Sequence, residues 1–273
     1  MNAPQGDEEL DQILAAFRKK DRERFALAVA VVATLLLALS AADGFDLARY
    51  TDAGRAIWRI IADAAPPDFS RSGSWLRPLA DTLAMSVAAT IIGSALALPM
   101  AFLAARNTGF PAPLSSAARL ILNVARSIPE LVFGIVFVAA VGFGPLPGVL
   151  ALACHSIGML GKFMSDHIEH VDPAPSIAMR SQGVSPARLI RYCLLPQIWP
   201  RVIDVTLYRW EHNVRAASVM GMIGAGGLGL ELMTAFGLFE YQEALALMII
   251  IFLLVTAIDS ASARLRAALT RQS

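Results

Sequence analysis

The sequence predicts an all-α polytopic membrane protein with about six transmembrane helices. Hydrophobic residues make up 56% of the 273 residues and charged residues only 16%, with a mean hydropathy of +0.57. An ordinary soluble domain has about 45–50% apolar and about 25% charged residues, so this chain has more apolar surface than water tolerates. The 23 basic and 22 acidic residues nearly cancel, so no overall field favours nucleic acid as a partner, whereas the apolar excess favours the lipid bilayer.

Uncharged runs predict the first two spans. Residues 25–42 carry no charge over 18 residues, just enough for a helix to cross about 30 Å of hydrocarbon. The second span, residues 82–105, includes Gly93 and Pro99, which helices tolerate in lipid. We expect the loop between these spans to include a short amphipathic helix at residues 53–64 on the outer surface.

A glycine and proline cluster separates the third span from the fourth. Residues 131–161 are uncharged, but glycines and prolines at 142–148 interrupt them, so a turn is expected there. Span three then covers roughly residues 114–141, with Arg126 and Glu130 near its entry, and Pro129 is expected to kink it. Span four covers roughly residues 146–165.

Two further spans complete the topology, at residues 201–221 and 241–262. With the N-terminus inside, the inner segments hold 16 Lys and Arg and the outer loops hold five, all between Arg49 and Arg77. This bias follows the positive-inside rule and places both termini in the cytoplasm. The predicted divisions are a cytoplasmic N-terminal segment at 1–24, a first helix with an extracytoplasmic loop at 25–78, a transmembrane domain at 79–265 and a cytoplasmic tail at 266–273.

Nucleotide-binding signals are weak or missing. Residues 224–229 match the GxGxxG pattern of dinucleotide sites, but they follow a membrane helix rather than a strand. We interpret these glycines and one proline as points of helix break or close packing: Pro129, Gly224, Gly226, Gly227 and Gly229. No GxxxxGK[ST] loop occurs in the sequence, so any ATP that drives this protein is expected to bind another subunit.

Metal-binding and catalytic signals are also weak. His167, His170 and Asp172 lie close together in the sequence. A histidine pair three residues apart, with no third ligand fixed by its spacing, is weak evidence, so a solvated helix end is the favoured interpretation and no metal site is predicted. His155 is expected to be a packed or hydrogen-bonded helix residue. We find no residues that suggest a buried catalytic pair, so none is predicted as catalytic. An intramembrane enzyme or a membrane scaffold remain alternatives.

The polar stretch at residues 177–196 predicts a docking element between two spans. It reads as a short helix ending at Gly183, a turn with Ser185 as N-cap and Pro186 at the first helical position, and a second helix that stops before Pro196.

This stretch resembles the coupling motif of bacterial ABC importer permeases. Ala178, Gly183, Leu195 and Pro196 occupy the expected places, while Ile177 replaces the usual glutamate and Cys193 the usual isoleucine. Three further segments are similar to the phosphonate-transport permease family, whose known relatives include permeases for phosphite and hypophosphite. These segments are residues 126–130, 208–211 and 224–229, and the resemblance covers residues ~80–265.

The resemblance implies a type I, MetI-like permease fold in a bacterial inner membrane. It also implies a homodimer, two cytoplasmic ABC ATPase subunits that bind ATP-Mg, and an extracytoplasmic binding protein that delivers the anion; this chain itself would bind no cofactor. The segment at 172–197 would couple to the ATPase. The coupling residues would be Ala178, Gly183, Val184, Ser185, Leu195 and Pro196. A permease for methionine or glycine betaine is the alternative within this class, because residues 224–229 look similar in methionine permeases.

Span five, at residues 201–221, has an unusual number of polar residues. Placing each ionised group in hydrocarbon costs at least about 2.5–3.5 kcal/mol in insertion free energy, so such residues are expected to face a cavity or one another. At 100° per residue, Arg209, His212 and Asn213 share one face, and Glu211 and Arg215 lie together on another. We therefore expect the first three to line the anion pathway and the last two to form a structural ion pair. The alternative is that Arg209 pairs with Asp204 or extends to the inner interface.

Overall fold

The computed structural model describes residues 4–42 and 47–270, which divide into two units at residues 62 and 63. Helix α1 (Pro4–Ala41) belongs to the first unit and contains a candidate membrane span within residues 19–41. Helix α2 (Leu47–Ala64) covers the amphipathic segment expected at residues 53–64, so that expectation of a helix is confirmed.

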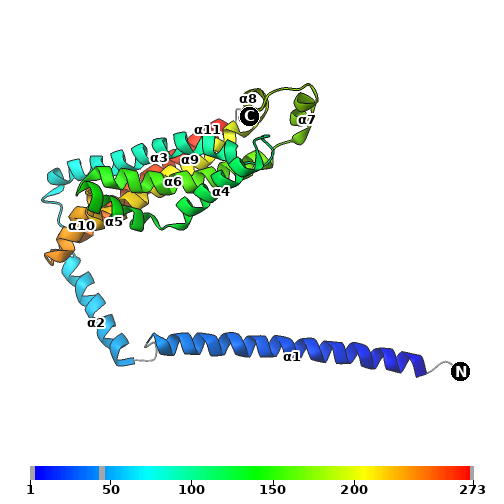
Figure 1. The fold of residues 1–273 in the computed structure, drawn as a ribbon. Coiled ribbons are helices and arrows are strands. Elements are labelled where there is room, and N and C mark those ends of the chain that lie inside the picture. Colours follow the sequence, from blue (N-terminus) through cyan, green and yellow to red (C-terminus); the bar gives the residue numbers. More distant parts are fainter. Residues whose placement is uncertain (1–3, 43–46, 271–273) are drawn as a thin grey trace. The chain divides into compact units, whose positions relative to one another are not determined.

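Three long helices form the centre of the second unit: α3 (Leu76–Ala104), α6 (Pro145–Glu169) and α9 (Leu195–Met220). They pack against one another along their lengths, and Figure 1 shows them side by side. They contain the predicted second, fourth and fifth spans. Pro99 lies inside α3 without ending it, because a transmembrane helix can re-satisfy the backbone groups that a proline leaves unpaired.

The third predicted span is two helices rather than one kinked helix. Helices α4 (Ala112–Ser127) and α5 (Glu130–Val141) meet at an angle of 87°. Ile128 between them is extended, as the residue before a proline prefers. The expectation of a kink at Pro129 was therefore wrong in degree, since the proline here ends α4 instead of bending it. Gly142 and Gly144, both with positive φ, make the predicted turn into α6.

The last part of the chain returns along the bundle. Helix α9 continues into a short 3₁₀ turn (Gly221–Ile223), and a glycine-rich turn leads to α10 (Leu228–Gly237). Helix α11 (Tyr241–Thr270) contains the sixth predicted span and packs against α9 and α10. Within the described residues, four helices are long and apolar enough to span a membrane, and six spans result if each bent pair counts as one.

Small residues bring the helices of the bundle close together. A Cβ on Gly158 of α6 would lie 2.4 Å from the backbone nitrogen of Arg126 in α4, and one on Gly161 would lie 2.4 Å from Leu122. Between α3 and α6, a Cβ on Gly93 would lie 2.6 Å from the Cβ of Ser156. Such close approach is how helices associate in lipid, where apolar surface gains nothing by leaving the solvent.

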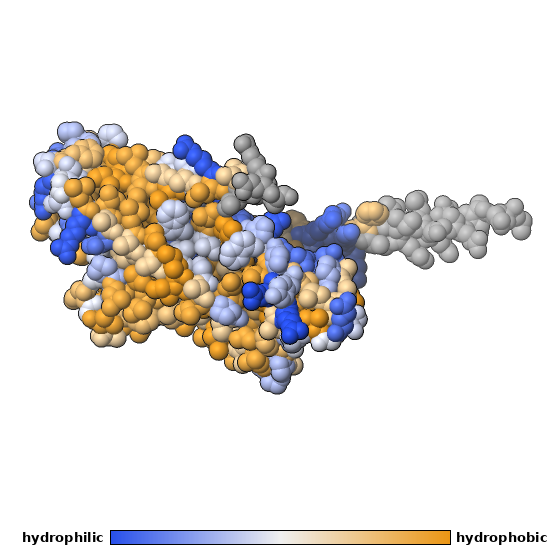
Figure 2. All heavy atoms as spheres, turned by 90° about the horizontal axis from the view of Figure 1, so that it is seen from above, coloured by the Kyte–Doolittle hydropathy of each residue, from blue (hydrophilic) through white to orange (hydrophobic). Residues whose placement is uncertain are grey.

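The surface of the second unit suits a hydrocarbon environment. Many large apolar side chains on it are exposed, including Ile91, Leu96, Ile135 and Phe252. The face drawn in Figure 2 is mostly hydrophobic, and hydrophilic side chains gather toward its two ends. A soluble protein rarely exposes an apolar patch of this extent, so the polytopic all-α class is confirmed.

Candidate functional site

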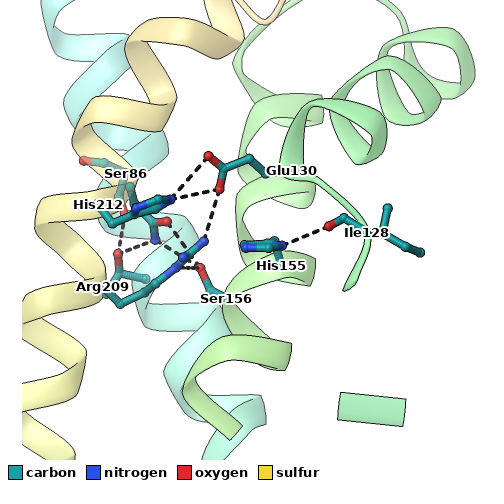
Figure 3. A network of polar contacts seen from close by, with 9 residues as sticks. Ser86, Ile128, Glu130, His155, Ser156, Arg209 and His212 are labelled. Carbon is teal, nitrogen blue, oxygen red and sulfur yellow. Dashed lines mark hydrogen bonds and ion pairs between the residues drawn. The ribbon is translucent and has the colours of Figure 1, made fainter. Parts of the chain in front are cut away.

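Helix α9 directs three polar side chains toward α3, α5 and α6. Arg209, His212 and Asn213 occupy one face of α9, as the helical spacing predicted, and meet side chains from the three neighbouring helices. Figure 3 shows this polar network inside the bundle.

Arg209 is the buried cation of the network, with only 4% of its side chain exposed. Its Nε donates a hydrogen bond to the hydroxyl of Ser156 on α6 at 2.8 Å, and its Nη2 lies 3.4 Å from Oε2 of Glu130 on α5. Asp204 was the alternative partner expected for Arg209, but its Oδ1 lies 3.9 Å from Nη1 of Arg266. Arg209 thus joins three helices through one carboxylate and one hydroxyl.

Asn213 is fully buried one turn further along α9. Its Nδ2 donates to the hydroxyl of Thr90 on α3 at 2.9 Å and to that of Ser156 at 3.2 Å. The Thr90 hydroxyl in turn donates to the carbonyl oxygen of Ser86 at 2.6 Å. Asn213 therefore links α9 to α3 and α6 and helps to hold the Ser156 hydroxyl beside Arg209.

Glu130 is the acid of the network and the first residue of α5. Its carboxylate lies 3.1 Å from Nε2 of His212 and is shared between that ring and Arg209. The N-terminal position suits a carboxylate, because the dipole of the helix favours negative charge there. Glu130 and His212 are 22% and 40% exposed, respectively, whereas Arg209 behind them is buried.

An open groove of about 340 Å³ runs over Glu130 and His212. Its lining is Pro129, Glu130, Leu131, His155, His212, Ala216, Val219 and Met220. The ring of His155 is held by its Nδ1 at 3.0 Å from the carbonyl oxygen of Ile128, so the expectation of a hydrogen-bonded helix residue is confirmed. The lining is mostly apolar, and its polar side chains are Glu130, His155 and His212.

The opposite side of α9 faces α11, and the ion pair expected between Glu211 and Arg215 is wrong. Arg215 pairs with Asp259, with Nη2 2.6 Å from both carboxylate oxygens, and Glu211 pairs with Arg266. Residues four apart on one helix can pair, but α11 packs against α9 and presents a charge of opposite sign to each of them. The result is two interhelical pairs instead of one pair within α9.

The predicted docking element contains helix α7 (Pro173–Ser181), capped by Asp172, whose side chain accepts from the backbone N–H of Ala174 at 2.9 Å. Gly183 follows with a φ of +73°, and no atom lies within 4 Å of where its Cβ would be. Ala178 and Ser185 are exposed, and Val184 is half-buried. The turn is therefore presented at the surface of the described chain.

The second helix of this element does not stop before Pro196. Helix α8 (Pro186–Leu189) runs through a π-helical turn (Ile190–Leu194) directly into α9, with Pro196 in the first turn of α9. A proline ring clashes with the carbonyl four residues earlier in a regular helix, and the wider π turn lies at that place. Leu195 is half-buried and Pro196 is exposed. One continuous helical path thus connects the turn at Gly183 to Arg209.

The glycines at residues 224–229 form the turn between α9 and α10. Gly224, Gly226 and Gly227 all have positive φ, a conformation that glycine adopts without strain. A Cβ on Gly229 would lie 1.8 Å from the carbonyl oxygen of Ser218. This is a turn between helices and has no preceding strand, in contrast to a dinucleotide site.

The histidine cluster near residue 170 has structural contacts. The ring of His170 contacts the carbonyl oxygen of Asp166 at 2.7 Å, and Asp172 is the cap of α7. Among the residues that the structure describes, no group of three or more potential metal ligands is found.

The sequence interpretation did not identify the acid and hydroxyl partners of Arg209. Glu130, Ser156 and Thr90 lie on other helices, and Glu130 is 79 residues away from Arg209. The sequence did contain one signal, because Glu130 is the only acidic residue between Arg126 and Lys162. A single carboxylate in an otherwise uncharged membrane segment predicts a basic partner on another helix.

Comparison with known proteins gives consistent matches. A family described as binding-protein-dependent transport system inner membrane components matches residues 97–272. The phosphite transport system permease protein PtxC of Stutzerimonas stutzeri is 53% identical over 208 residues, covering 76% of this chain and 75% of that protein. The putative phosphite transport system permease protein HtxC of the same organism is 36% identical over 264 residues, covering 95% and 93%.

The fold also matches solved structures. The MetNI methionine ABC transporter in an inward-facing conformation has a chain with a TM-score of 0.62 and 22% identity, covering 71% of this chain and 95% of that one. At this identity the likeness shows the fold alone, and it confirms the MetI-like fold expected from the sequence.

Proposed function

The chain belongs to the family of binding-protein-dependent transport system inner membrane components, and on this premise we propose that it is the permease subunit of an ABC importer for a small phosphorus oxyanion, phosphite or a phosphonate. The observation that carries the choice of substrate is the 53% identity to a phosphite permease over three quarters of both chains. A membrane permease accounts for the spans and the polar network together, whereas an enzyme would need a catalytic pair.

The transport pathway in this proposal passes the groove over α5, α6 and α9. His212 lies at the groove with Glu130, and Arg209 and Asn213 lie directly behind them. The planar guanidinium of Arg209 matches the oxygens of a phosphorus oxyanion, and burial strengthens such a contact by excluding water. Asn213 and Ser156 fix the orientation of Arg209, so these residues select for an anion and let the binding protein supply most of the affinity.

Coupling to ATP is assigned to residues 172–197. In the proposal, Ala178, Gly183, Val184 and Ser185 contact a cytoplasmic ATPase that binds ATP-Mg, and Leu195 and Pro196 begin the helix that transmits its movement. Two observations support this assignment. The turn at Gly183 is exposed, and α8, the π-helical turn and α9 form one helical path from that turn to Arg209. Alternating access would follow if closure of the ATPase below tilted α9 and opened or closed the groove.

The proposed assembly has two copies of this chain, two ATPase subunits and one extracytoplasmic binding protein. Both termini lie in the cytoplasm in this arrangement, with residues 1–24 and 266–273 as cytoplasmic segments, 25–78 as the first span and outer loop, and 79–265 as the permease domain. The bias of basic residues supports the orientation. The chain itself binds no cofactor.

Uptake by the assembled transporter tests the proposal. The chain is expressed with a candidate ABC ATPase and a candidate binding protein in a bacterium that cannot take up phosphite, and accumulation of phosphite is measured. We expect ATP-dependent accumulation of phosphite, or of a phosphonate such as methylphosphonate. Accumulation of methionine or glycine betaine and of neither phosphorus oxyanion would favour the alternative substrates instead.

Coupling is tested at Gly183. Gly183→Trp should prevent co-purification of the ATPase, because the indole projects from the exposed turn into the surface where the ATPase docks. Gly183→Asn is the matched control, since asparagine tolerates positive φ and adds little volume. Normal ATPase association with the tryptophan variant would contradict the docking assignment.

A further inference from the structure

Glu130 occupies the place at Arg209 where the oxyanion of the proposed function would bind. A carboxylate and a phosphorus oxyanion offer the same feature to a guanidinium, two oxygens that share negative charge. Glu130 lies in the groove wall, between the open side and Arg209, and Figure 3 shows its carboxylate facing both Arg209 and His212. Any anion that reaches Arg209 through this groove therefore meets Glu130 first.

The contact of Glu130 with Arg209 is loose for an ion pair. The atoms Nη2 and Oε2 are 3.4 Å apart, whereas charge-assisted N–H···O bonds are usually about 2.7–2.9 Å long. In the same bundle, Arg215 contacts both oxygens of Asp259 at 2.6 Å. Among the described contacts, Arg209 uses only its Nε and one Nη, so its fork of five N–H groups is only partly occupied.

The carboxylate of Glu130 can also be stabilised by the N-terminus of α5 instead of by Arg209. It begins α5 immediately after the break at Ile128 and Pro129, where α4 and α5 meet at 87°. A carboxylate in the first turn of a helix is stabilised by the helix N-terminus whether or not it contacts an arginine. A change of rotamer, or a small movement of α5 at the break, would separate Glu130 from Arg209 and leave the guanidinium to an incoming anion.

Building on the proposed function, we propose that Glu130 is a tethered internal anion that the transported oxyanion displaces from Arg209. Without cargo, the carboxylate neutralises Arg209 and lies against Nε2 of His212. The arriving oxyanion takes these N–H groups, and the carboxylate moves to the N-terminus of α5. When the bundle opens to the cytoplasm, Glu130 returns to Arg209 and expels the cargo. A deep arginine that would otherwise retain an anion thus releases it.

Binding of phosphite to the full chain in lipid nanodiscs, measured by isothermal titration calorimetry beside uptake by the complete transporter, tests the displacement. Glu130→Gln should bind phosphite at least tenfold more tightly than the natural protein and should transport it more slowly, because the competing anion is gone. Glu130→Asp should also bind more tightly, because the shorter side chain keeps the charge but no longer reaches Arg209. Adding Arg209→Gln to either variant should remove the gain.

The control Asp259→Asn removes one carboxylate from the other side of α9 and should leave phosphite affinity unchanged. A gain in Glu130→Gln with natural affinity in Glu130→Asp would indicate simple repulsion and overturn displacement. Unchanged affinity in both would overturn it as well, while uptake by the natural protein would leave the proposed function intact. If the natural protein transports no phosphorus oxyanion, the proposed function fails, and the role of Glu130 in transport fails with it.

Discussion

The two sides of α9 both carry charges, but they are paired in different ways. Toward α11, Arg215 is held by two contacts of 2.6 Å to Asp259, and Glu211 pairs with Arg266. Toward α5 and α6, one carboxylate at 3.1 to 3.4 Å serves both His212 and Arg209. The α11 side joins two helices tightly, whereas the groove side keeps a buried cation that is only partly satisfied.

Charged residues inside a membrane protein can join helices to one another or bind a transported ion. A close pair between helices, such as that of buried Glu211 with Arg266, neutralises both charges and joins the two helices. A loosely paired cation beside an open groove retains the capacity to bind another anion. We therefore expect variants on the groove side to change transport, and variants on the α11 side to change stability.

The largest effect is expected for Arg209→Gln, which removes the buried cation. Uptake of phosphite should fall about 10- to 100-fold, since a hydrogen bond to a charged group contributes about 1.5–3 kcal/mol. Uptake by the assembled transporter is measured, with co-purification of the ATPase as evidence of an intact complex. Arg215→Gln, on the other side of the same helix, is the matched control and should transport normally. Equal transport by both variants would remove the distinction between the two sides.

Gly93→Leu should disturb the groove side without changing any charge. Because a Cβ at Gly93 would already lie 2.6 Å from that of Ser156, a larger side chain must push α3 and α6 apart and move the hydroxyl that orients Arg209. We expect a loss of about 1–3 kcal/mol in stability, measured by thermal unfolding, together with lower uptake. Gly237→Leu, at a position with no atoms within 4 Å of its Cβ, should show neither effect.

Glu211→Gln should destabilise the α11 side. Glu211 is buried and pairs with Arg266, so replacing the carboxylate by a neutral amide is expected to cost about 1–2 kcal/mol. A lower unfolding temperature of the purified chain in detergent is the readout. Phosphite affinity should stay as it is in the natural protein, and an altered affinity would show that this pair also belongs to the transport pathway.

Asp259→Asn should have the smallest effect. Asp259 and Arg215 are 41% and 47% exposed, and pairs this open usually contribute no more than about 1 kcal/mol. A shift in the unfolding temperature smaller than that of Glu211→Gln is expected. A larger shift would mean that the short contacts of Arg215 hold α9 and α11 together more strongly than their exposure indicates.

Local rules predicted four membrane-length helices and the faces of α9. Apolar runs of membrane length identified the spans in α1, α3, α6 and α11, because lipid demands both the length and a near absence of charge. The 100° spacing separated Arg209, His212 and Asn213 from Glu211 and Arg215 correctly, since that angle is a property of every α-helix. Pro129 marked the position of the break, although not its angle of 87°.

Composition and helical periodicity therefore predicted the polytopic helical class, four of the membrane-length helices and the polar residues that share a face of α9. The partners of the charged residues follow from the packing of the helices: Glu130 for Arg209, Asp259 for Arg215 and Arg266 for Glu211. The physical reason is that hydrophobicity and helical periodicity act within one segment. The partner of a charge depends on which helices pack together, and in this bundle glycines and other small residues at the contacts between helices allow that packing.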